Sequence, residues 1–204
     1  MYIPDIYRND DPEEISRFIR ANGFATLVTT ADGNPWATHL PLMLRETAGG
    51  QFLHGHLSIE NPQARELQGA KILAIFLGPD AYISSSWYDH ENVPTWNYIA
   101  VHAYGTARVL DHDQTIAHLS ELTRHYEQGL ENPVSVEDLS EKTMRQARAI
   151  VAFEIRIDEL HAKQKLSQNR DQANHEAVIR ALEKRAEGRD QEIAREMRRQ
   201  RRSD

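Results

Sequence analysis

The sequence predicts a mainly β fold of the α+β class, a mostly antiparallel barrel with peripheral helices and a helical C-terminal tail. Short apolar and β-branched segments separated by turn residues occupy the chain as far as residue 109, which is typical of consecutive antiparallel strands. Residues 111–126 and 138–150 then show the apolar spacing of helices, and residues 151–157 (VAFEIRI) return to a strand pattern. We expect this last strand to close the barrel, because no other segment is left to pair with it.

Composition narrows the possible functions. The chain of 204 residues is 40% hydrophobic and 27% charged, as in ordinary globular proteins. The absence of cysteine excludes disulfides, thiolate metal sites and cysteine nucleophiles. The net charge of −7 argues against a nucleic-acid-binding surface over the whole molecule. No apolar run is long enough to cross a bilayer and the N-terminus is acidic, so we expect a cytoplasmic location.

The length favours a single core with an appendage. We expect one domain over residues 1–170 and a helical extension over residues 171–204. The extension ends in a basic run, REMRRQRRSD, which leaves weak DNA contact open as a possibility.

The N-terminal region is predicted to supply one helix and one strand pair. The helix starts at Asp11, which can cap it ahead of a proline, and ends at Gly23. Residues 24–30 and 35–45 have strand composition, and a turn at residues 31–34 joins them into a hairpin.

A third strand is predicted at residues 51–57. Side chains alternate along a strand, so His54 and His56 fall on one face. Asn61 precedes a proline and opens a short helix, and residues 72–77 have the pattern of a buried strand.

The C-terminal part is predicted to be irregular and then helical. Residues 163–170 (KQKLSQNR) form a polar run without periodicity, so we expect no regular element there. The tail from residue 171 has helical spacing, with Val178, Ile179 and Leu182 apolar. Past Glu187 it is highly charged, and we expect it to be frayed.

Residues 82–105 are the most distinctive part of the sequence. They hold two of the three tryptophans together with tyrosines, serines and histidines, and Trp87 and Trp96 flank a polar loop that we expect to join two strands. Large rings beside hydroxyl and amide groups suit a flat heteroaromatic ligand. The alternative is that these rings belong to the barrel core or pack its loops.

Other kinds of site have less support. His54 and His56 share a face, but no carboxylate pattern accompanies them, so we predict no metal site. The Gly-x-Ser-x-Gly, Gly-x-Gly-x-x-Gly and Walker patterns are absent, no helix-turn-helix is visible, and we predict no catalytic residue. Four polar residues remain as candidates for binding an anion: Lys165, Ser167, Asn169 and Arg170.

Several motifs carry a family resemblance: His54-Gly55-His56-Leu57, Asn61-Pro62-Gln63, Gly78-Pro79-Asp80-Ala81-Tyr82-Ile83-Ser84, Ser86-Trp87-Tyr88, Val93-Pro94-Thr95-Trp96-Asn97-Tyr98, Val101-His102 and Lys165-Leu166-Ser167-Gln168-Asn169-Arg170. Together they resemble the PaiB-type negative transcriptional regulators over roughly residues 1–186. Two positions depart from the family pattern: Ser85 stands where the family usually has proline, and Gln164 where it usually has tryptophan.

This resemblance implies a fold, a cofactor and a partner. The family is similar in fold to the pyridoxamine 5'-phosphate oxidase-like split barrels, which are typically homodimers that bind FMN in a cleft between subunits. The barrel would then be a split barrel, the partner a second copy of the chain, and the flat ligand the isoalloxazine ring of FMN.

The resemblance also implies which residues bind the cofactor. The predicted FMN-binding residues are His39, His54, Gly55, His56, Ser58, Asn61, Ser86, Trp87, Trp96, Asn97, Lys165, Ser167, Asn169 and Arg170. Those between residues 39 and 61 would line the phosphate and ribityl side, those between 86 and 97 would face the ring, and those between 165 and 170 would come from the partner or cover the cleft. The run 167–169 could instead cap the helix that begins near Asp171.

Three functions remain open at this stage. We favour an FMN-binding negative regulator of transcription of the PaiB type. The alternatives are a flavin-dependent oxidoreductase acting on a small or haem-like substrate, and a flavin-binding module without turnover. Regulation follows from the resemblance alone, whereas cofactor binding also has support from the residue chemistry.

Overall fold

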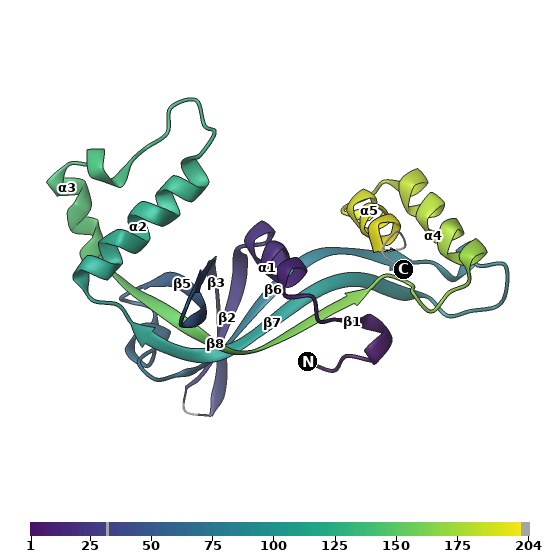
Figure 1. Cartoon of the computed structure of the whole chain (residues 1–204), viewed down its shortest axis with the longest axis horizontal. Helices are drawn as coiled ribbons and strands as arrows, with labels where there is room; N and C mark the ends of the chain where they lie inside the picture. Colours follow the sequence, from purple (N-terminus) through teal and green to yellow (C-terminus); the bar gives the residue numbers. More distant parts are fainter. Residues whose placement is uncertain (32, 201–204) are drawn as a thin grey trace. The chain divides into compact units, whose positions relative to one another are not determined.

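The computed structural model describes residues 1–31 and 33–200 (Figure 1). Asp32 in the first predicted turn and residues 201–204 of the basic run lie outside the described residues. Among the described residues, no helix is both long and apolar enough to cross a membrane.

The chain divides into two compact units. Unit 1 consists of residues 1–18, 76–102 and 161–204, and unit 2 of residues 19–75 and 103–160. Each unit has buried apolar side chains of its own, such as Ile83 and Leu182 in unit 1 and Leu27 and Phe153 in unit 2.

The strands form one sheet in the order β3-β2-β6-β7-β8-β5-β4, with β1 paired to β8. Their bounds are β1 Arg8–Asn9, β2 Phe24–Ala31, β3 Asn34–Pro41, β4 Met43–Thr47, β5 Gly50–Ser58, β6 Lys71–Ile83, β7 Thr95–Val109 and β8 Ile150–Lys165. The pairs β2–β3, β4–β5 and β5–β8 run antiparallel, which confirms the predicted hairpin and the predicted place of the last strand.

The predicted strand over residues 35–45 is interrupted. It forms β3 and β4, and Leu42 between them leaves the ladder because its N–H donates to the carbonyl of Gly23 at 2.8 Å. This break bends the chain out of the β2–β3 hairpin into a second hairpin with β5, whose closing residues Thr47 and Gly50 face each other.

The α-helices are α1 Pro12–Ala21, α2 His112–Glu127, α3 Glu141–Met144, α4 Gln172–Arg185 and α5 Asp190–Gln200 (Figure 1). The short 3₁₀ helices are η1 Asp5–Tyr7, η2 Pro62–Arg65, η3 Ser85–Trp87, η4 Val136–Asp138 and η5 Arg145–Ala149. The predicted start of α1 is confirmed, since Asp11 Oδ1 accepts the N–H groups of Glu13 and Glu14 at 2.9 and 3.1 Å.

The prediction of one helix over residues 138–150 is wrong. Residues 136–149 form η4, α3 and η5 instead. A new helix begins after Ser140, because the Oγ of Ser140 accepts the N–H of Thr143 at 3.3 Å and caps α3.

The prediction of an irregular segment over residues 163–170 is wrong for its first three residues. β8 continues to Lys165, and β1 pairs with its end, Arg8 opposite Lys163 and Asn9 opposite Ala162. β1, from the N-terminus of the same chain, supplies the backbone hydrogen bonds that keep these residues in a strand. The polar sequence of residues 163–165 does not show that such a pairing exists.

The expected fraying past Glu187 is also wrong. In α5, Ile193, Ala194 and Met197 are at most 1% exposed and pack with α4 in the core cluster of unit 1. Three apolar residues at helical spacing suffice to dock α5, although the rest of the helix is charged. The neighbouring arginines form ion pairs, such as Arg198 with Glu183 at 3.0 Å.

Candidate functional site

The aromatic side chains predicted to face a ligand lie partly on an exposed face of unit 1. Trp96 is 52% exposed, and its ring lies edge-on to Tyr82 of β6 with the centroids 5.9 Å apart. Tyr98 falls on the same face of β7 as Trp96, because side chains alternate along a strand. Lys163 Nζ lies 5.3 Å from the centroid of Tyr98, a cation–π contact. This face combines apolar ring area with positive charge.

Lys165, at the end of β8, lies in the electrostatic field of two other cations. Lys165 Nζ donates a hydrogen bond to Thr95 Oγ1. Burial lowers the pKa of Lys165, and the positive charges of Lys163 and Arg170 lower this pKa further. The Arg170 guanidinium lies over the ring of Tyr88, 4.9 Å from its centroid. Because its neighbours disfavour the charged form of Lys165, a bound anion would stabilise that charge.

Asn97 points the opposite way from Trp96, into the interior of unit 1. It is fully buried, its Nδ2 donates to Ser167 Oγ at 2.9 Å, and Ser167 Oγ donates back to Oδ1 at 3.2 Å. Asn97 Nδ2 also lies 3.5 Å from Met197 Sδ in α5. Ser167 has a φ of 62°, an uncommon left-handed backbone that this reciprocal pair helps to hold. Both residues therefore fix the chain around them and do not present donors at the surface.

The short helix η3 carries Ser86 and Trp87. Ser84 Oγ accepts the N–H of Ser86 at 3.2 Å and lies 2.8 Å from its exposed hydroxyl. Trp87 packs against the core cluster of unit 1, and the guanidinium of Arg185 lies 5.0 Å from its ring centroid. Trp87 thus has a packing role in unit 1.

The remaining residues of the C-terminal motif have mixed exposure. Asn169 is exposed. The alternative that residues 167–169 cap α4 is wrong, because the cap is Asp171, whose Oδ1 accepts the N–H of Asn174 at 2.9 Å. Gln164, which departs from the family pattern, is 8% exposed, and its carbonyl accepts from Gln168 Nε2 at 2.5 Å.

In unit 2, His39 lies on an exposed part of the β2–β3 hairpin. Its Nδ1 is 3.0 Å from Thr26 Oγ1, and its ring stacks on Phe24 with centroids 6.4 Å apart. Phe24 is 70% exposed, so this stack is open to solvent in the single chain.

Asn61 belongs to a second polar group of unit 2. Its Oδ1 accepts the N–H of Gln63 at 3.0 Å, and its Nδ2 donates to Thr38 Oγ1 at 3.0 Å. Gln63 is 2% exposed, accepts from the Thr38 hydroxyl and donates to Thr29 Oγ1 at 2.9 Å. Sequence reasoning missed Thr38 as a partner, because its contact with Gln63 joins residues far apart in the chain. Ser58 lies nearby in sequence, is exposed, and accepts the N–H of Glu60 at 3.2 Å.

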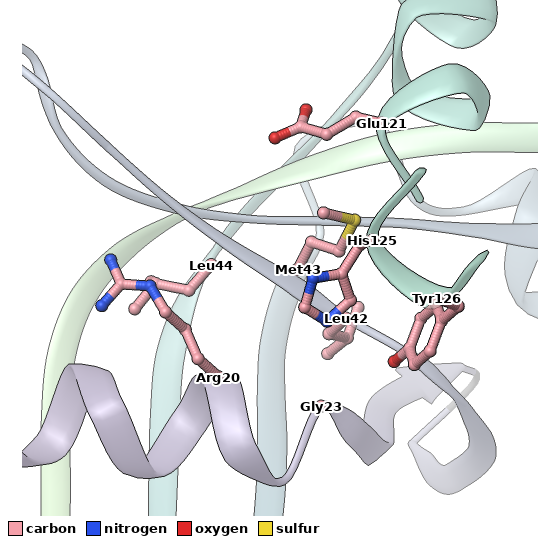
Figure 2. A pocket seen from close by; sticks show the side chains of 8 residues that line it. All are labelled: Arg20, Gly23, Leu42, Met43, Leu44, Glu121, His125 and Tyr126. Atoms are coloured by element: carbon pink, nitrogen blue, oxygen red, sulfur yellow. The ribbon is translucent and has the colours of Figure 1, made fainter. Parts of the chain in front are cut away.

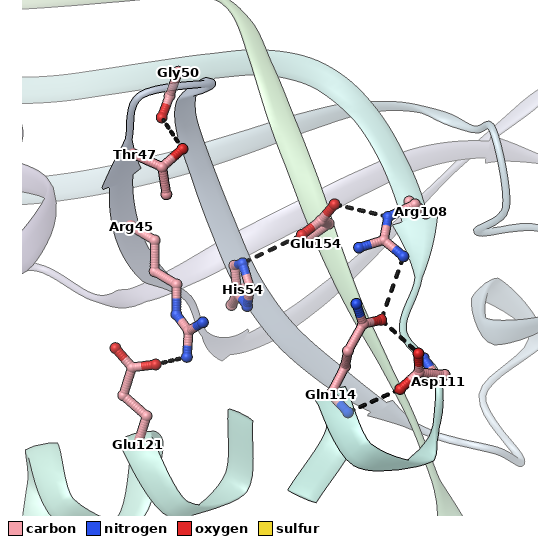
Figure 3. A network of polar contacts seen from close by, with 9 residues as sticks. All are labelled: Arg45, Thr47, Gly50, His54, Arg108, Asp111, Gln114, Glu121 and Glu154. Atoms are coloured by element: carbon pink, nitrogen blue, oxygen red, sulfur yellow. Dashed lines mark hydrogen bonds and ion pairs between the residues drawn. The ribbon is translucent and has the colours of Figure 1, made fainter. Parts of the chain in front are cut away.

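His54 and His56 on β5 belong to a group of buried and half-buried polar side chains, and Figure 3 shows the contacts of His54 in it. His54 Nε2 lies 3.5 Å from Glu154 Oε2, and Arg108 Nε donates to Glu154 Oε1 at 2.8 Å. His56 Nδ1 lies 3.2 Å from His118 Nε2 of α2. Glu154 could have been noticed as the charged residue inside the apolar strand VAFEIRI, whereas nothing local marks His118.

These histidines are held neutral. Burial lowers the pKa of His118 to about 3 and that of His54 to about 4, and the charge of Arg45 acts in the same direction on both. Burial also lowers the pKa of His56. Across the described part of the chain, no group of three or more possible ligands could hold a metal ion, and Nδ1 of His54 and Nδ1 of His118 find no hydrogen-bond partner.

Gly55 is required by packing inside unit 2. A Cβ at this position would lie 2.6 Å from Leu42 Cδ2 and 3.1 Å from Phe153 Cζ. Any side chain would collide with the core, so the glycine allows β5 to approach β3 and β8 closely.

The predicted residues therefore fall into separate groups. Unit 1 brings Asn97 and Ser167 together inside, and it places Trp96 beside Tyr82 on an exposed face. Unit 2 places His39 on its exposed hairpin and His54 and His56 in a group of buried and half-buried polar side chains. The exposed ring area and the cations of unit 1 fit a flat ligand that carries a phosphate, since ammonium and guanidinium groups form charge-assisted hydrogen bonds with phosphate oxygens.

Sequence comparison connects these features with a known family. Residues 1–159 match the family model described as "Putative FMN-binding domain". The chain is 43% identical over 185 residues to the Protease synthase and sporulation protein PAI 2 of Bacillus subtilis, an alignment that covers 90% of this chain and 89% of that protein.

Two solved structures have a similar fold. The FAD and heme binding protein from Mycobacterium smegmatis superposes with a TM-score of 0.64 at 20% identity, covering 84% of this chain and 79% of that one. The flavocytochrome Anf3 from Azotobacter vinelandii superposes with a TM-score of 0.59 at 19% identity, covering 78% and 69%. The predicted split barrel with peripheral helices is thereby confirmed.

Proposed function

The chain belongs to the family of FMN-binding domains that its residues 1–159 match, and from this premise we propose that it is an FMN-binding negative regulator of transcription of the PaiB type. FMN is the cofactor of this family. The relative from Bacillus subtilis supports a regulatory role, because its name connects it with protease synthesis and sporulation. The observation that carries the cofactor assignment within the chain is the exposed Trp96 and Tyr82 pair, in the same unit as Lys165, whose pKa is lowered by burial and by the charges of Lys163 and Arg170.

In this proposal Trp96 contacts the isoalloxazine ring, and Lys165 and Arg170 hold the phosphate. An indole that is 52% exposed offers ring area, and the two cations offer donors that an anion would satisfy. Bound FMN would supply a redox-active ring, and the protein would orient it. Ser86 and Asn169 are exposed and remain candidates for further polar contacts, whereas Asn97 and Ser167 act as positioning residues.

The predicted FMN-binding residues of unit 2 have different roles in this proposal. His39 and Ser58 are exposed and available to the phosphate or ribityl group, and Asn61 orients the chain before η2. His54 and Gly55 are buried, so they would support the strand and not touch the cofactor.

Flavin retention tests the cofactor assignment. The purified protein is incubated with FMN and desalted, and its absorption spectrum is recorded. We expect a retained flavin band in the wild-type protein and a weaker one in Trp96→Ala. Trp36→Ala removes a tryptophan that is 45% exposed in unit 2 and serves as the matched control. No flavin band in the wild-type protein, or equal retention by the two variants, would contradict the assignment.

The role of Lys165 is tested by comparing FMN with riboflavin, which lacks the phosphate. Hydrogen bonds to charged groups contribute roughly 1.5–3 kcal/mol, so Lys165→Met should weaken FMN binding about ten- to a hundredfold. Riboflavin binding should change little. An equal loss for both ligands would show that Lys165 acts through folding and not through the phosphate.

A regulator and an enzyme make different predictions for the loaded protein. We expect FMN-loaded protein to consume no NADPH in air beyond the rate of free FMN. Sustained NADPH turnover would contradict the regulator and support a flavin-dependent oxidoreductase.

Direct DNA contact is the weaker of two routes to regulation, the other being a partner protein. The basic side chains of α5 argue against the first route, because Arg198 pairs with Glu176 and Glu183 and Arg199 pairs with Glu14. Affinity for DNA at several salt concentrations should be the same for the full chain and for a chain ending after Gln200, which retains α5. A smaller salt dependence in the shortened chain would instead establish the last four residues as a DNA-binding arm.

A homodimer is part of the proposal. Large apolar side chains that are exposed in the single chain support it, among them Phe24 at 70% and Leu77 at 62%. Sedimentation velocity should give the mass of two chains. A single-chain mass at micromolar concentration would contradict this part.

A further inference from the structure

Unit 2 contains a cavity of about 210 Å³ that is lined by none of the predicted FMN-binding residues (Figure 2). Leu42, Met43 and Leu44, at the break between β3 and β4, supply its apolar wall. Arg20 reaches it from the end of α1, and Glu121 and Tyr126 reach it from α2 (Figure 2). His125 also lines it, so the cavity combines an apolar wall with one acidic side chain, one basic side chain and an imidazole (Figure 2).

Gly23 keeps this cavity open. A Cβ at position 23 would lie 3.3 Å from the carbonyl oxygen of Leu42 and 3.3 Å from Tyr126 Oη. The N–H of Leu42 donates to the carbonyl of Gly23 at 2.8 Å, so the two segments are tied together beside this contact. A side chain at position 23 would therefore have to displace the Tyr126 phenol and narrow the space.

The two charged groups retain free bonding capacity. Arg20 forms an ion pair with Glu46, and Glu121 forms one with Arg45. A guanidinium carries five N–H donors and a carboxylate has about four acceptor positions. One ion pair leaves most of these positions available, so each group can still bind a ligand atom of opposite charge.

We propose that this cavity binds a free α-amino acid with an apolar side chain of about the size of leucine or methionine. The ligand carboxylate would accept from Arg20, its ammonium would donate to Glu121, and its side chain would lie on Leu42, Met43 and Leu44. The volume supports this class, because 210 Å³ corresponds to about seven waters of liquid volume. It lies below the roughly 300–1,000 Å³ of pockets for drug-sized ligands. The site is separate from the proposed FMN contacts and does not depend on them.

Three ligands that share the isobutyl side chain test the assignment of both charged groups. Isothermal titration calorimetry of the full-length FMN-loaded protein is carried out with L-leucine, with 4-methylpentanoate, which lacks the amine, and with 3-methylbutylamine, which lacks the carboxylate. Leucine should bind, and each analogue should bind at least about tenfold more weakly, because one charge-assisted hydrogen bond is lost. Absence of saturable leucine and methionine binding at millimolar concentration would overturn the proposal, as would equal binding by either analogue.

Two variants with matched controls locate the binding in this cavity. Glu121→Gln should weaken leucine about tenfold or more and leave 4-methylpentanoate unchanged, and Glu131→Gln in an exposed loop is its control. Glu121→Gln also breaks the pair with Arg45, so Gly23→Ala provides a second variant that keeps every charge. Gly49→Ala is the control for it, because a Cβ there meets Thr47 Oγ1 at an ordinary 3.5 Å.

Gly23→Ala should weaken leucine binding at least tenfold, with the melting temperature and FMN retention close to wild type. Wild-type leucine affinity in folded Gly23→Ala protein would place the binding elsewhere and overturn the proposal. If FMN retention failed in the wild-type protein while leucine still bound, the cofactor assignment would fall and the amino-acid site would stand.

Discussion

Units 1 and 2 both bury polar side chains, and they satisfy them in different ways. In unit 1 the amide of Asn97 and the hydroxyl of Ser167 exchange two hydrogen bonds. In unit 2 His54 and His118 are buried beside charged groups, and each has an Nδ1 that finds no partner within the described residues. The first arrangement uses groups that do not ionise near neutral pH, and the second uses groups that do.

This difference predicts which unit is sensitive to pH and which is sensitive to packing. A neutral amide and hydroxyl pair contributes the same stability at any moderate pH. A buried histidine contributes only while it stays neutral, because its charged form loses hydration and meets the positive charge of Arg45. Unit 2 should therefore respond to acid, and unit 1 should respond to changes in packing.

The largest effect is expected from the core of unit 1. Leu182 is fully buried among the side chains of α4, α5 and the strands. Leu182→Ala should lower the free energy of unfolding by about 2–5 kcal/mol, because it removes apolar contacts and leaves a cavity. Chemical denaturation measures the change. Leu130→Ala, at a site that is 55% exposed, should stay within about 0.5 kcal/mol, and a loss as large as that of Leu182→Ala would contradict the packing described for unit 1.

The next effect is acid destabilisation of unit 2. The pKa values of His54 and His118 are depressed in the folded protein to about 4 and about 3. The unfolded chain therefore takes up protons first as the pH falls below about 6.5, and stability is lost from there down to the folded pKa values. The loss should reach at most about 3–4 kcal/mol for His54, whose pKa is lowered from 6.5 to about 4, at about 1.4 kcal/mol per unit of pKa.

Denaturation curves between pH 8 and about pH 4 measure this loss. His118→Asn should flatten the pH profile, since one of the two groups no longer titrates. His112→Asn, at an exposed position of the same helix, should keep the wild-type profile. If His118→Asn and the wild type lose stability in parallel, the buried histidines are not the cause.

The smallest effect concerns the polar pair of unit 1. Asn97→Leu leaves the buried Ser167 hydroxyl without its amide and should cost about 1–3 kcal/mol. The double variant Asn97→Leu, Ser167→Ala should recover part of this loss, because neither polar group then remains unpaired. Unlike the histidine effect, the loss should be the same at pH 5 and pH 8. A loss of stability that differs between pH 5 and pH 8 would contradict the proposed difference in pH sensitivity between units 1 and 2.

Local sequence patterns predicted the elements whose hydrogen bonds join residues close together in the chain. The alternation of apolar residues, the cap at Asp11 and the turn residues predicted the β2–β3 hairpin and α1. The extent of β8 and the order in α5 were missed, because both depend on distant partners. β1 pairs with Lys163 and Ala162, and the side chains of α4 cover Met197.

The candidate site was predicted less completely, for the same reason. Trp96 and Asn97 were both expected to face the ring, although adjacent side chains of a strand point in opposite directions. In the structure Trp96 is exposed and Asn97 is buried. Asn97 is inside because Ser167, seventy residues later, supplies its hydrogen bonds. His118 escaped notice because its partner His56 lies on a strand sixty-two residues earlier.

The sequence by itself determined a mostly antiparallel barrel from periodicity along the chain, and its motifs carried the resemblance that implied the family, the split barrel and FMN. The tertiary structure alone decided which polar residues are buried, which histidines stay neutral and where a cavity remains beside Gly23. The physical reason is that burial, charge proximity and empty volume depend on side chains from several segments, and no local window of the sequence contains them.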